Sequence, residues 1–151
     1  MKFEKPTLKD VSEMLALVEP EVKRGNILPR SEEEVANAIR SYILARNAEE
    51  IVGFCSLYIY TPRLAEVRSL IVSEKYQGQG LGSKLVSLVL DEGKDLGVCD
   101  FLVLTYRESM FKKLGFEVIE KTQIPNQKIW ADCIKCKHFP KCDEIALFKQ
   151  V

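Results

Sequence analysis

Hydrophobic and polar positions at the start of the chain change from strand-like to helical spacing. A short strand over residues 2–6 is followed by Thr7, which can cap a helix with Asp10 as its partner three residues on. The apolar face of this helix recurs at helical spacing and consists of Val11, Met14, Leu15 and Val18. The pattern then breaks between Gly25 and Pro29, where we expect a loop.

The next segment predicts a second helix and then a hairpin. Ser31 and Glu34 form a Ser-x-x-Glu capping box at the start of the helix. Its apolar stripe consists of Val35, Ala38, Ile39 and Tyr42. Residues 41–46 and 51–60 read as strands on either side of the polar break at 47–50, which predicts an antiparallel pair.

Strands and helices alternate in the second half. Residues 65–72 read as a strand, and residues 82–96 read as a helix that Gly97 ends. The remaining elements are a buried strand, a short helix closed by Gly115 and two final strands, over residues 100–105, 108–116, 117–121 and 144–150.

This order of elements predicts an α+β fold on a mixed α/β sheet. The strand–helix–strand passage from Ala65 to Thr105 is a crossover, and a crossover joins parallel strands. The other strands follow one another as a meander, so we expect a mostly antiparallel sheet flanked by helices rather than a doubly wound one. We find no repeat, low-complexity tract or linker, and residues 1–151 are expected to form a single domain.

Composition narrows the function classes. Hydrophobic residues make up 46% and charged residues 29% of the chain, which supports a packed core. Lys plus Arg and Asp plus Glu each number 22, and this balance argues against a nucleic-acid partner, which requires a basic surface. No apolar run has the length of a membrane span or the position of a signal peptide, so we expect a cytoplasmic protein without a membrane partner.

Candidate chemistry first appears in the stretch YQGQGLGSKL, residues 76–85. A glycine cluster between a strand and a helix indicates unusual dihedrals or close approach of a ligand to the backbone. The helix N-terminus adds free N–H groups and positive potential, which suit a phosphate or pyrophosphate. The spacing matches neither the dinucleotide fingerprint nor the P-loop. The alternative is a tight turn without a ligand.

The longer stretch SLIVSEKYQGQGLGSKLV resembles the acetyl-CoA signature of the GNAT superfamily of N-acetyltransferases. The core of that signature, Gln/Arg-x-x-Gly-x-Gly/Ala, is matched by Gln77, Gly80 and Gly82. FKKLGF, residues 111–116, is similar to the downstream motif of the superfamily. The predicted element order is that of the GNAT fold, so the resemblance covers nearly the whole chain.

The resemblance implies direct transfer of an acetyl group from acetyl-CoA to an amine in a ternary complex. Main-chain groups of the 65–72 strand would hold the pantetheine and acetyl group, and one N–H there would polarise the thioester carbonyl. The pyrophosphate would lie on residues 77–83. The implied cofactor-binding residues are Leu70, Ile71, Val72, Gln77, Gly78, Gln79, Gly80, Leu81, Gly82 and Ser83.

Two candidate catalytic residues follow from the same resemblance. Amine attack needs a neutral nitrogen, and Glu66 falls where some superfamily members carry a base. Alternation would put Glu66, Arg68 and Leu70 on one face, although Glu66 is alternatively a surface or ion-paired carboxylate. The leaving thiolate is often protonated by a tyrosine in a Tyr-x-x-x-Gly-Phe motif, where this chain has Phe111. Tyr106 is either a nearby substitute or a packed side chain.

The acceptor is indicated by three further stretches, GNILPRSEEEV, AEVRSLIV and KIWADCIKCKHFPKCDEIAL. They resemble short amino-acid N-acetyltransferases similar to N-acetylglutamate synthase, which implies L-glutamate as substrate and arginine biosynthesis as pathway. Two substrate carboxylates need cations, and we expect Arg30, Arg68 and Lys128 to bind them. Each of the three is alternatively a solvated or ion-paired surface charge.

The C-terminal segment 128–144 is rich in cysteine, with Cys133, Cys136, His138 and Cys142 close together. Such residues can bind zinc, but a zinc site usually has two well-separated pairs. The spacing favours reduced structural thiols over zinc, and zinc over a redox disulfide. No metal ligand is therefore assigned.

Other functions stay open at this point. The same fold could acetylate a protein N-terminus, a polyamine or another small amine. A non-catalytic acyl-CoA sensor is motivated by Phe111 at the tyrosine position. A zinc-knuckle nucleic-acid module fits poorly with the neutral charge. The sequence does not determine the oligomeric state, although the superfamily resemblance makes a homodimer one expectation.

Overall fold

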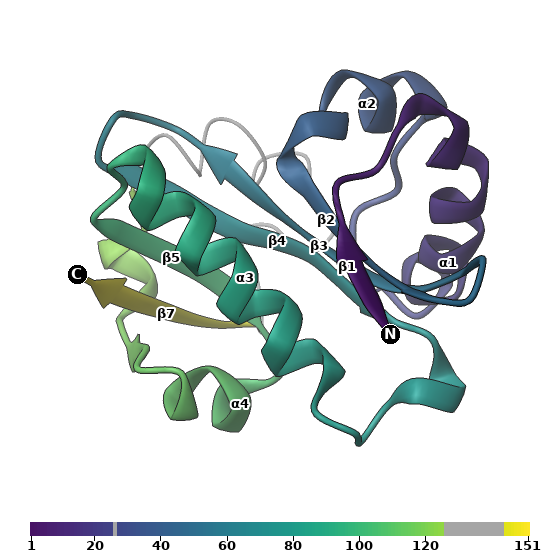
Figure 1. The fold of residues 1–151 in the computed structure, drawn as a ribbon. Helices are drawn as coiled ribbons and strands as arrows, with labels where there is room; N and C mark the ends of the chain where they lie inside the picture. The colour runs from purple at the N-terminus through teal and green to yellow at the C-terminus, as the bar shows by residue number, and fades with distance from the viewer. Residues whose placement is uncertain (26, 126–143) are drawn as a thin grey trace. The chain divides into compact units, whose positions relative to one another are not determined.

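A computed structural model describes residues 1–25, 27–125 and 144–151, and the elements follow one another in the predicted order (Figure 1). The strands are β1 (Lys2–Glu4), β2 (Tyr42–Asn47), β3 (Glu50–Ile59), β4 (Leu64–Val72), β5 (Asp100–Thr105), β6 (Glu117–Val118) and β7 (Ile145–Gln150). The α-helices are α1 (Val11–Lys23), α2 (Glu32–Asn37), α3 (Leu81–Leu96) and α4 (Glu108–Lys113).

The strands form one mixed sheet in the order β1-β2-β3-β4-β5-β7-β6. The pair β4–β5 is parallel, with Leu64 opposite Asp100 and Glu66 opposite Leu102, as the crossover predicted. The pairs β1–β2, β2–β3, β5–β7 and β6–β7 are antiparallel. The predicted α+β class and the mixed sheet with one parallel crossover pair are therefore confirmed.

The chain is divided into two compact units. The first unit comprises residues 1–57 and 67–92, and the second comprises residues 58–66 and 93–151. The boundary crosses β4 after Glu66, so this strand contributes to both units. The single-domain organisation over residues 1–151 stays a prediction.

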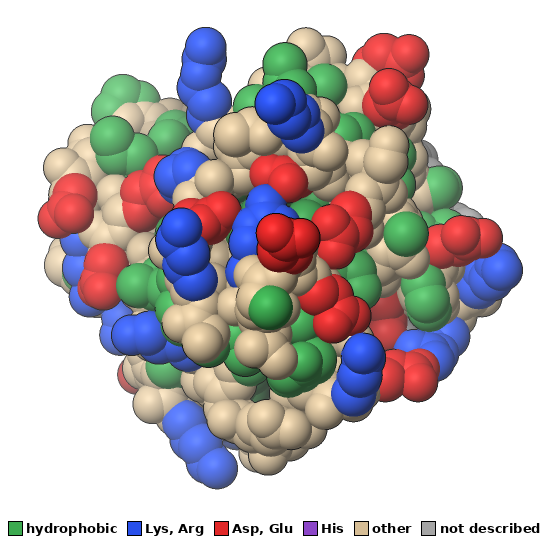
Figure 2. Space-filling model, turned by 45° about the vertical axis from the view of Figure 1, so that its right-hand side comes forward, with side chains coloured by type: hydrophobic (Ala, Val, Ile, Leu, Met, Phe, Trp, Pro, Cys, Tyr) green, Lys and Arg blue, Asp and Glu red, His purple; other side chains and the backbone are tan. Residues whose placement is uncertain are grey.

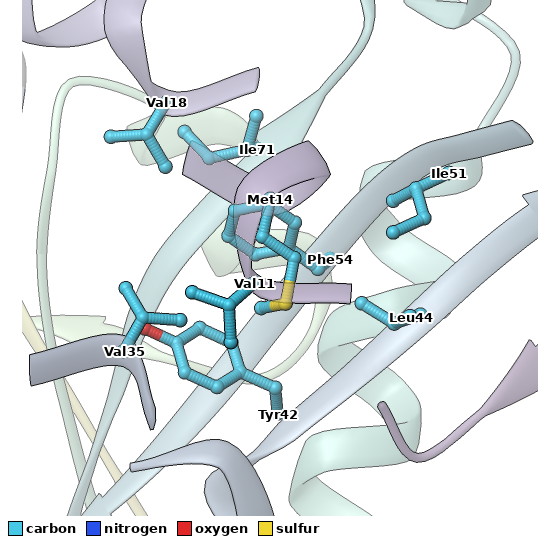
Figure 3. Close-up of a cluster of buried hydrophobic side chains, with 9 residues drawn as sticks. All are labelled: Val11, Met14, Val18, Val35, Tyr42, Leu44, Ile51, Phe54 and Ile71. Atoms are coloured by element: carbon cyan, nitrogen blue, oxygen red, sulfur yellow. The ribbon is translucent and has the colours of Figure 1, made fainter. Parts of the chain in front are cut away.

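The core of the first unit is built on the apolar face predicted for α1. Val11, Met14 and Val18 are buried, as the helical spacing required. Figure 3 shows the cluster that they form with residues of α2 and the strands, namely Val35, Tyr42, Leu44, Ile51, Phe54 and Ile71. Each such side chain contributes about 1.5–3 kcal/mol by leaving water.

Local capping explains where the helices of the first unit begin. The Thr7 side chain accepts a hydrogen bond from the Lys9 N–H, and Asp10 completes the predicted capping box on a short 3-10 turn before α1. The Ser31 hydroxyl accepts from the Glu34 N–H at the start of α2. Helix α2 ends at Asn37, before the end of its predicted apolar stripe, and Tyr42 belongs to β2 instead.

The second unit has its own buried cluster of Leu64, Leu102, Ile124 and Ala146. Strand β7 lies between β5 and β6, with Val103 opposite Leu147 in its pairing with β5. Gly115 follows Leu114, the C-cap of α4, and has a positive φ of 94°, as a helix-ending glycine requires. Within the described ranges, no helix is long and apolar enough to cross a membrane.

Candidate active site

Strand β4 contains an irregular residue in the middle of its sequence. Ser69 has a left-handed backbone, with φ of 56°, and its side chain is buried. Such a conformation is uncommon for a residue other than glycine and is typical of a β-bulge or of a functional site. The alternation expected for Glu66, Arg68 and Leu70 therefore does not extend across Ser69.

Arg30 contacts this irregular residue from the loop before α2. One guanidinium nitrogen, Nη1, donates hydrogen bonds to the Ser69 hydroxyl and, at 3.1 Å, to the Tyr42 hydroxyl. The Arg30 Nε is buried, and no residue accepts a hydrogen bond from it in the described part of the chain. The structure thus places Arg30 beside the β4 irregularity rather than on an open surface.

The glycine stretch lies between β4 and α3. Gly78 and Gly80 have positive φ values of 76° and 82°, and nothing lies within 4 Å of the position that a Cβ atom would take at either residue. The Gln77 side chain donates to the Val72 carbonyl at 2.9 Å, which ties the loop to the end of β4. Helical hydrogen bonding begins when the Lys84 N–H reaches the Gly80 carbonyl at 3.1 Å. The left-handed backbones account for Gly78 and Gly80, and the open space beside them suits an approaching anion.

Glu66 lies in the part of β4 that belongs to the second unit. Its side chain is only 3% exposed, and the Tyr60 hydroxyl donates to Glu66 Oε1 at 2.6 Å. Glu66 is therefore not the surface carboxylate that the sequence left open. The sequence analysis did not single out Tyr60, because a tyrosine near a strand end carries no local signal of its partner.

The two aromatic positions considered for the proton donor differ in burial. Phe111 is 1% exposed and packs edge-on against Phe116, with 5.3 Å between ring centroids. The position of the motif tyrosine is thus part of the core in this chain. Tyr106 follows β5 and is 45% exposed, so it stays the candidate donor.

The structure describes only some of the remaining predicted site residues. The Arg68 carbonyl accepts hydrogen bonds from Ser56 Oγ at 3.2 Å and Cys55 Sγ at 3.6 Å, and its side chain is half-buried. Lys128 and the cysteine–histidine cluster of the C-terminal segment lie outside the described residues. Burial raises the pKa of the Cys55 thiol to about 12, so this residue is an inert core thiol. Across the described residues, no group of His, Cys, Asp and Glu could hold a metal ion.

The mixture of charges on the surface agrees with the equal numbers of acidic and basic residues in the sequence. On the face shown in Figure 2, acidic and basic side chains are interspersed rather than separated by sign. This face offers no continuous basic surface of the kind that nucleic acid requires.

Comparison with known proteins identifies the class. Residues 11–116 match the acetyltransferase (GNAT) family. An uncharacterized N-acetyltransferase of Chlorobaculum tepidum is 37% identical over 142 residues, which cover 94% of this chain and 91% of that protein. This chain therefore belongs to the GNAT family of acetyltransferases.

More distant similarity points to amino-acid acetyltransferases. The amino-acid acetyltransferase of Photorhabdus laumondii is 27% identical over 129 residues, which cover 84% of this chain and 29% of that protein. The structure of N-acetylglutamate synthase from Neisseria gonorrhoeae, complexed with coenzyme A and N-acetyl-glutamate, has a TM-score of 0.86 at 20% identity. The match covers 99% of this chain and 34% of the synthase, so this chain spans about a third of that enzyme.

A second structure has a similar length. The Mycobacterium tuberculosis protein Rv2747, also solved with CoA, has a TM-score of 0.85 at 19% identity, with 100% of this chain and 99% of that chain covered. At these identities the similarity confirms the GNAT fold, and the acceptor has to be argued from the residues of this chain.

Proposed function

We propose that this protein transfers the acetyl group of acetyl-CoA to the α-amine of an amino acid, with L-glutamate as the first candidate. The observation that supports the transfer is the glycine loop after β4, in a chain that belongs to the GNAT family. The choice of amino acid is supported by the distant similarity to amino-acid acetyltransferases and to N-acetylglutamate synthase. An acetylated glutamate would fit the arginine biosynthesis implied by the resemblance.

The residues of the loop fit the proposed cofactor. Gly78 and Gly80 are exposed, have left-handed backbones and leave open space where a side chain would stand. Residues 77–83 would hold the pyrophosphate with main-chain N–H groups at the start of α3. Main-chain groups of residues 70–72 would hold the pantetheine, and acetyl-CoA would supply the activated acetyl thioester.

Proton transfer is assigned to side chains of this chain. The acceptor nitrogen attacks in its neutral form and loses one proton as the amide forms and the carbon–sulfur bond breaks. Glu66 takes that proton, because it is a buried carboxylate on the same strand as residues 70–72. Tyr106 supplies a proton to the departing sulfur.

Recognition of an acidic amino acid is assigned to arginine. Arg68 is half-buried in β4, and Arg30 is held close to the same strand through Ser69. A guanidinium binds a carboxylate through two parallel hydrogen bonds, so two arginines suit the two carboxylates of L-glutamate. Lys128 keeps its proposed role as a third cation.

Two alternatives remain and are separated by experiment. The same machinery could acetylate a protein N-terminus or another small amine. A non-catalytic acyl-CoA sensor is favoured by the burial of Phe111 at the position of the motif tyrosine.

The test is a CoA-release assay with acetyl-CoA and a panel of free amino acids, polyamines and short peptides. We expect turnover selective for L-glutamate, with a large rise in the KM for glutamate in Arg68→Ala. Arg40→Ala is the matched control, because Arg40 is exposed and has no proposed role. Turnover only with peptides or polyamines would overturn the acceptor, and binding of CoA without turnover on any acceptor would overturn the enzyme.

A further inference from the structure

We propose that Tyr60 is a positioning residue that holds the Glu66 carboxyl group in the orientation of a base. This inference rests on the proposed function and deepens it. Neither the resemblance to the GNAT superfamily nor any motif in the sequence assigns a role to Tyr60. The assignment comes from the 2.6 Å hydrogen bond that the Tyr60 hydroxyl donates to Glu66 Oε1.

The backbone around Tyr60 is fixed by its own turn. The N–H groups of Tyr60 and Thr61 both donate to the Leu64 carbonyl, at 2.9 and 3.2 Å. The Thr61 hydroxyl in turn accepts from the Leu64 N–H at 3.0 Å. Leu64 is two residues before Glu66 in β4. The turn therefore fixes the backbone of Tyr60 relative to the backbone of Glu66.

The Tyr60 ring is also held by packing. The Tyr58 ring lies against it, with 4.8 Å between ring centroids and 56° between ring planes. A side chain fixed by both a turn and a ring contact is preorganised, and such support is what a proton-transfer group needs in order to keep its geometry.

Burial makes the hydrogen bond to Glu66 important for holding its carboxyl group. A carboxylate that is 3% exposed loses most of its hydration and has to be stabilised by hydrogen bonds. The Tyr60 phenol donates a hydrogen bond to Glu66 Oε1 at 2.6 Å. The bond therefore sets the rotation of the carboxyl group.

The test is a double-mutant cycle on kcat, with wild type, Tyr60→Phe, Glu66→Gln and the double variant. Tyr60→Phe keeps the ring that packs against Tyr58 and removes only the hydroxyl. We expect kcat to fall about 10-fold in Tyr60→Phe and about 100-fold or more in Glu66→Gln, in the range of general-base contributions. In the Glu66→Gln background, Tyr60→Phe should change kcat less than 2-fold, and the KM for acetyl-CoA should stay unchanged throughout.

A matched control removes another hydrogen-bonded tyrosine hydroxyl. The Tyr76 hydroxyl accepts from Asn47 Nδ2 at 2.7 Å, and because this bond does not involve Glu66, Tyr76→Phe and Glu66→Gln should be independent in kcat. If Glu66→Gln does not fold, Glu66→Asp takes its place in the cycle. Equal costs of Tyr60→Phe in both backgrounds would overturn the role of Tyr60 and leave the proposed function intact. Absence of turnover in the wild type would refute the proposed function and this role with it.

Discussion

Replacing Gly53 by alanine tests whether β3 and β4 approach as closely as the structure shows. A Cβ atom at Gly53 would lie 2.9 Å from the Ile71 carbonyl oxygen and 3.2 Å from Leu85 Cδ1. The Leu85 side chain can move by a few tenths of an ångström, but the Ile71 oxygen belongs to the backbone of β4. The methyl group therefore has to displace β4.

The magnitude follows from two opposing effects. In an open strand, Gly→Ala would gain about 0.5–1 kcal/mol, because alanine loses less conformational freedom on folding. Overpacking a buried site costs about 1–3 kcal/mol. The expected net change is a loss of about 1–2 kcal/mol in the free energy of unfolding. At about 2–4 °C per kcal/mol for a chain of this size, the Tm should fall by about 2–8 °C.

The assay combines calorimetry with steady-state kinetics. Because residues 70–72 are proposed to hold the pantetheine, displacement of Ile71 should also raise the KM for acetyl-CoA. Gly97→Ala is the control, since Gly97 has a φ of 101° with nothing within 4 Å of its Cβ position. It should lose about 1 kcal/mol from backbone strain alone and keep its KM. A Gly53→Ala protein as stable as the wild type or more so would refute the close approach.

Three further changes have defined outcomes. Gly80→Ala should raise the KM for acetyl-CoA about 10-fold, because alanine disfavours the left-handed backbone of the loop; an unchanged KM in steady-state kinetics would contradict the loop's role. Arg30→Lys should lose about 1–2 kcal/mol in urea unfolding, because lysine cannot reproduce the guanidinium contacts with Tyr42 and Ser69; unchanged stability would count against those contacts. Burial opposes ionisation of Asp10, but the Thr7 N–H and the Arg46 guanidinium outweigh it and hold the pKa of the Asp10 carboxyl below its usual value. The ionised Asp10 carboxylate therefore stabilises the fold at pH values above its pKa in the unfolded chain, which is near 4. This stabilisation is lost as the pH falls through the lower pKa of the folded protein. Asp10→Asn should therefore be less stable than wild type at pH 7, and the difference should shrink on acidification; a difference constant from pH 7 to pH 2 would exclude this linkage.

The features that were predicted from sequence are those with local causes. The cap at Thr7, the glycine after α3 and the loop at residues 77–83 each depend on dihedrals and hydrogen bonds within a few residues. The element order and the parallel β4–β5 pair followed from spacing and connectivity.

The features that were missed depend on contacts that local residue spacing does not give. The left-handed backbone of Ser69 carries no sequence signal, and its partner Arg30 is 39 positions away. The hydrogen bond from Tyr60 to Glu66 forms across a turn whose geometry the spacing does not give. Tyr42 was assigned to a helical stripe because its spacing fits one, but α2 ends at Asn37 and tertiary packing places Tyr42 in β2. Strand order has the same limit, since nothing local puts β7 between β5 and β6.

Acetyl transfer to an amino acid is tested most sharply by identifying the product. The protein is incubated with acetyl-CoA labelled in the acetyl group and an equimolar mixture of the common amino acids, and the labelled products are separated by mass spectrometry. We predict that the label accumulates on the α-nitrogen of L-glutamate and that this product disappears in Glu66→Gln. Label on no amino acid, while the labelled acetyl-CoA binds, would contradict an amino acid as the acetyl acceptor.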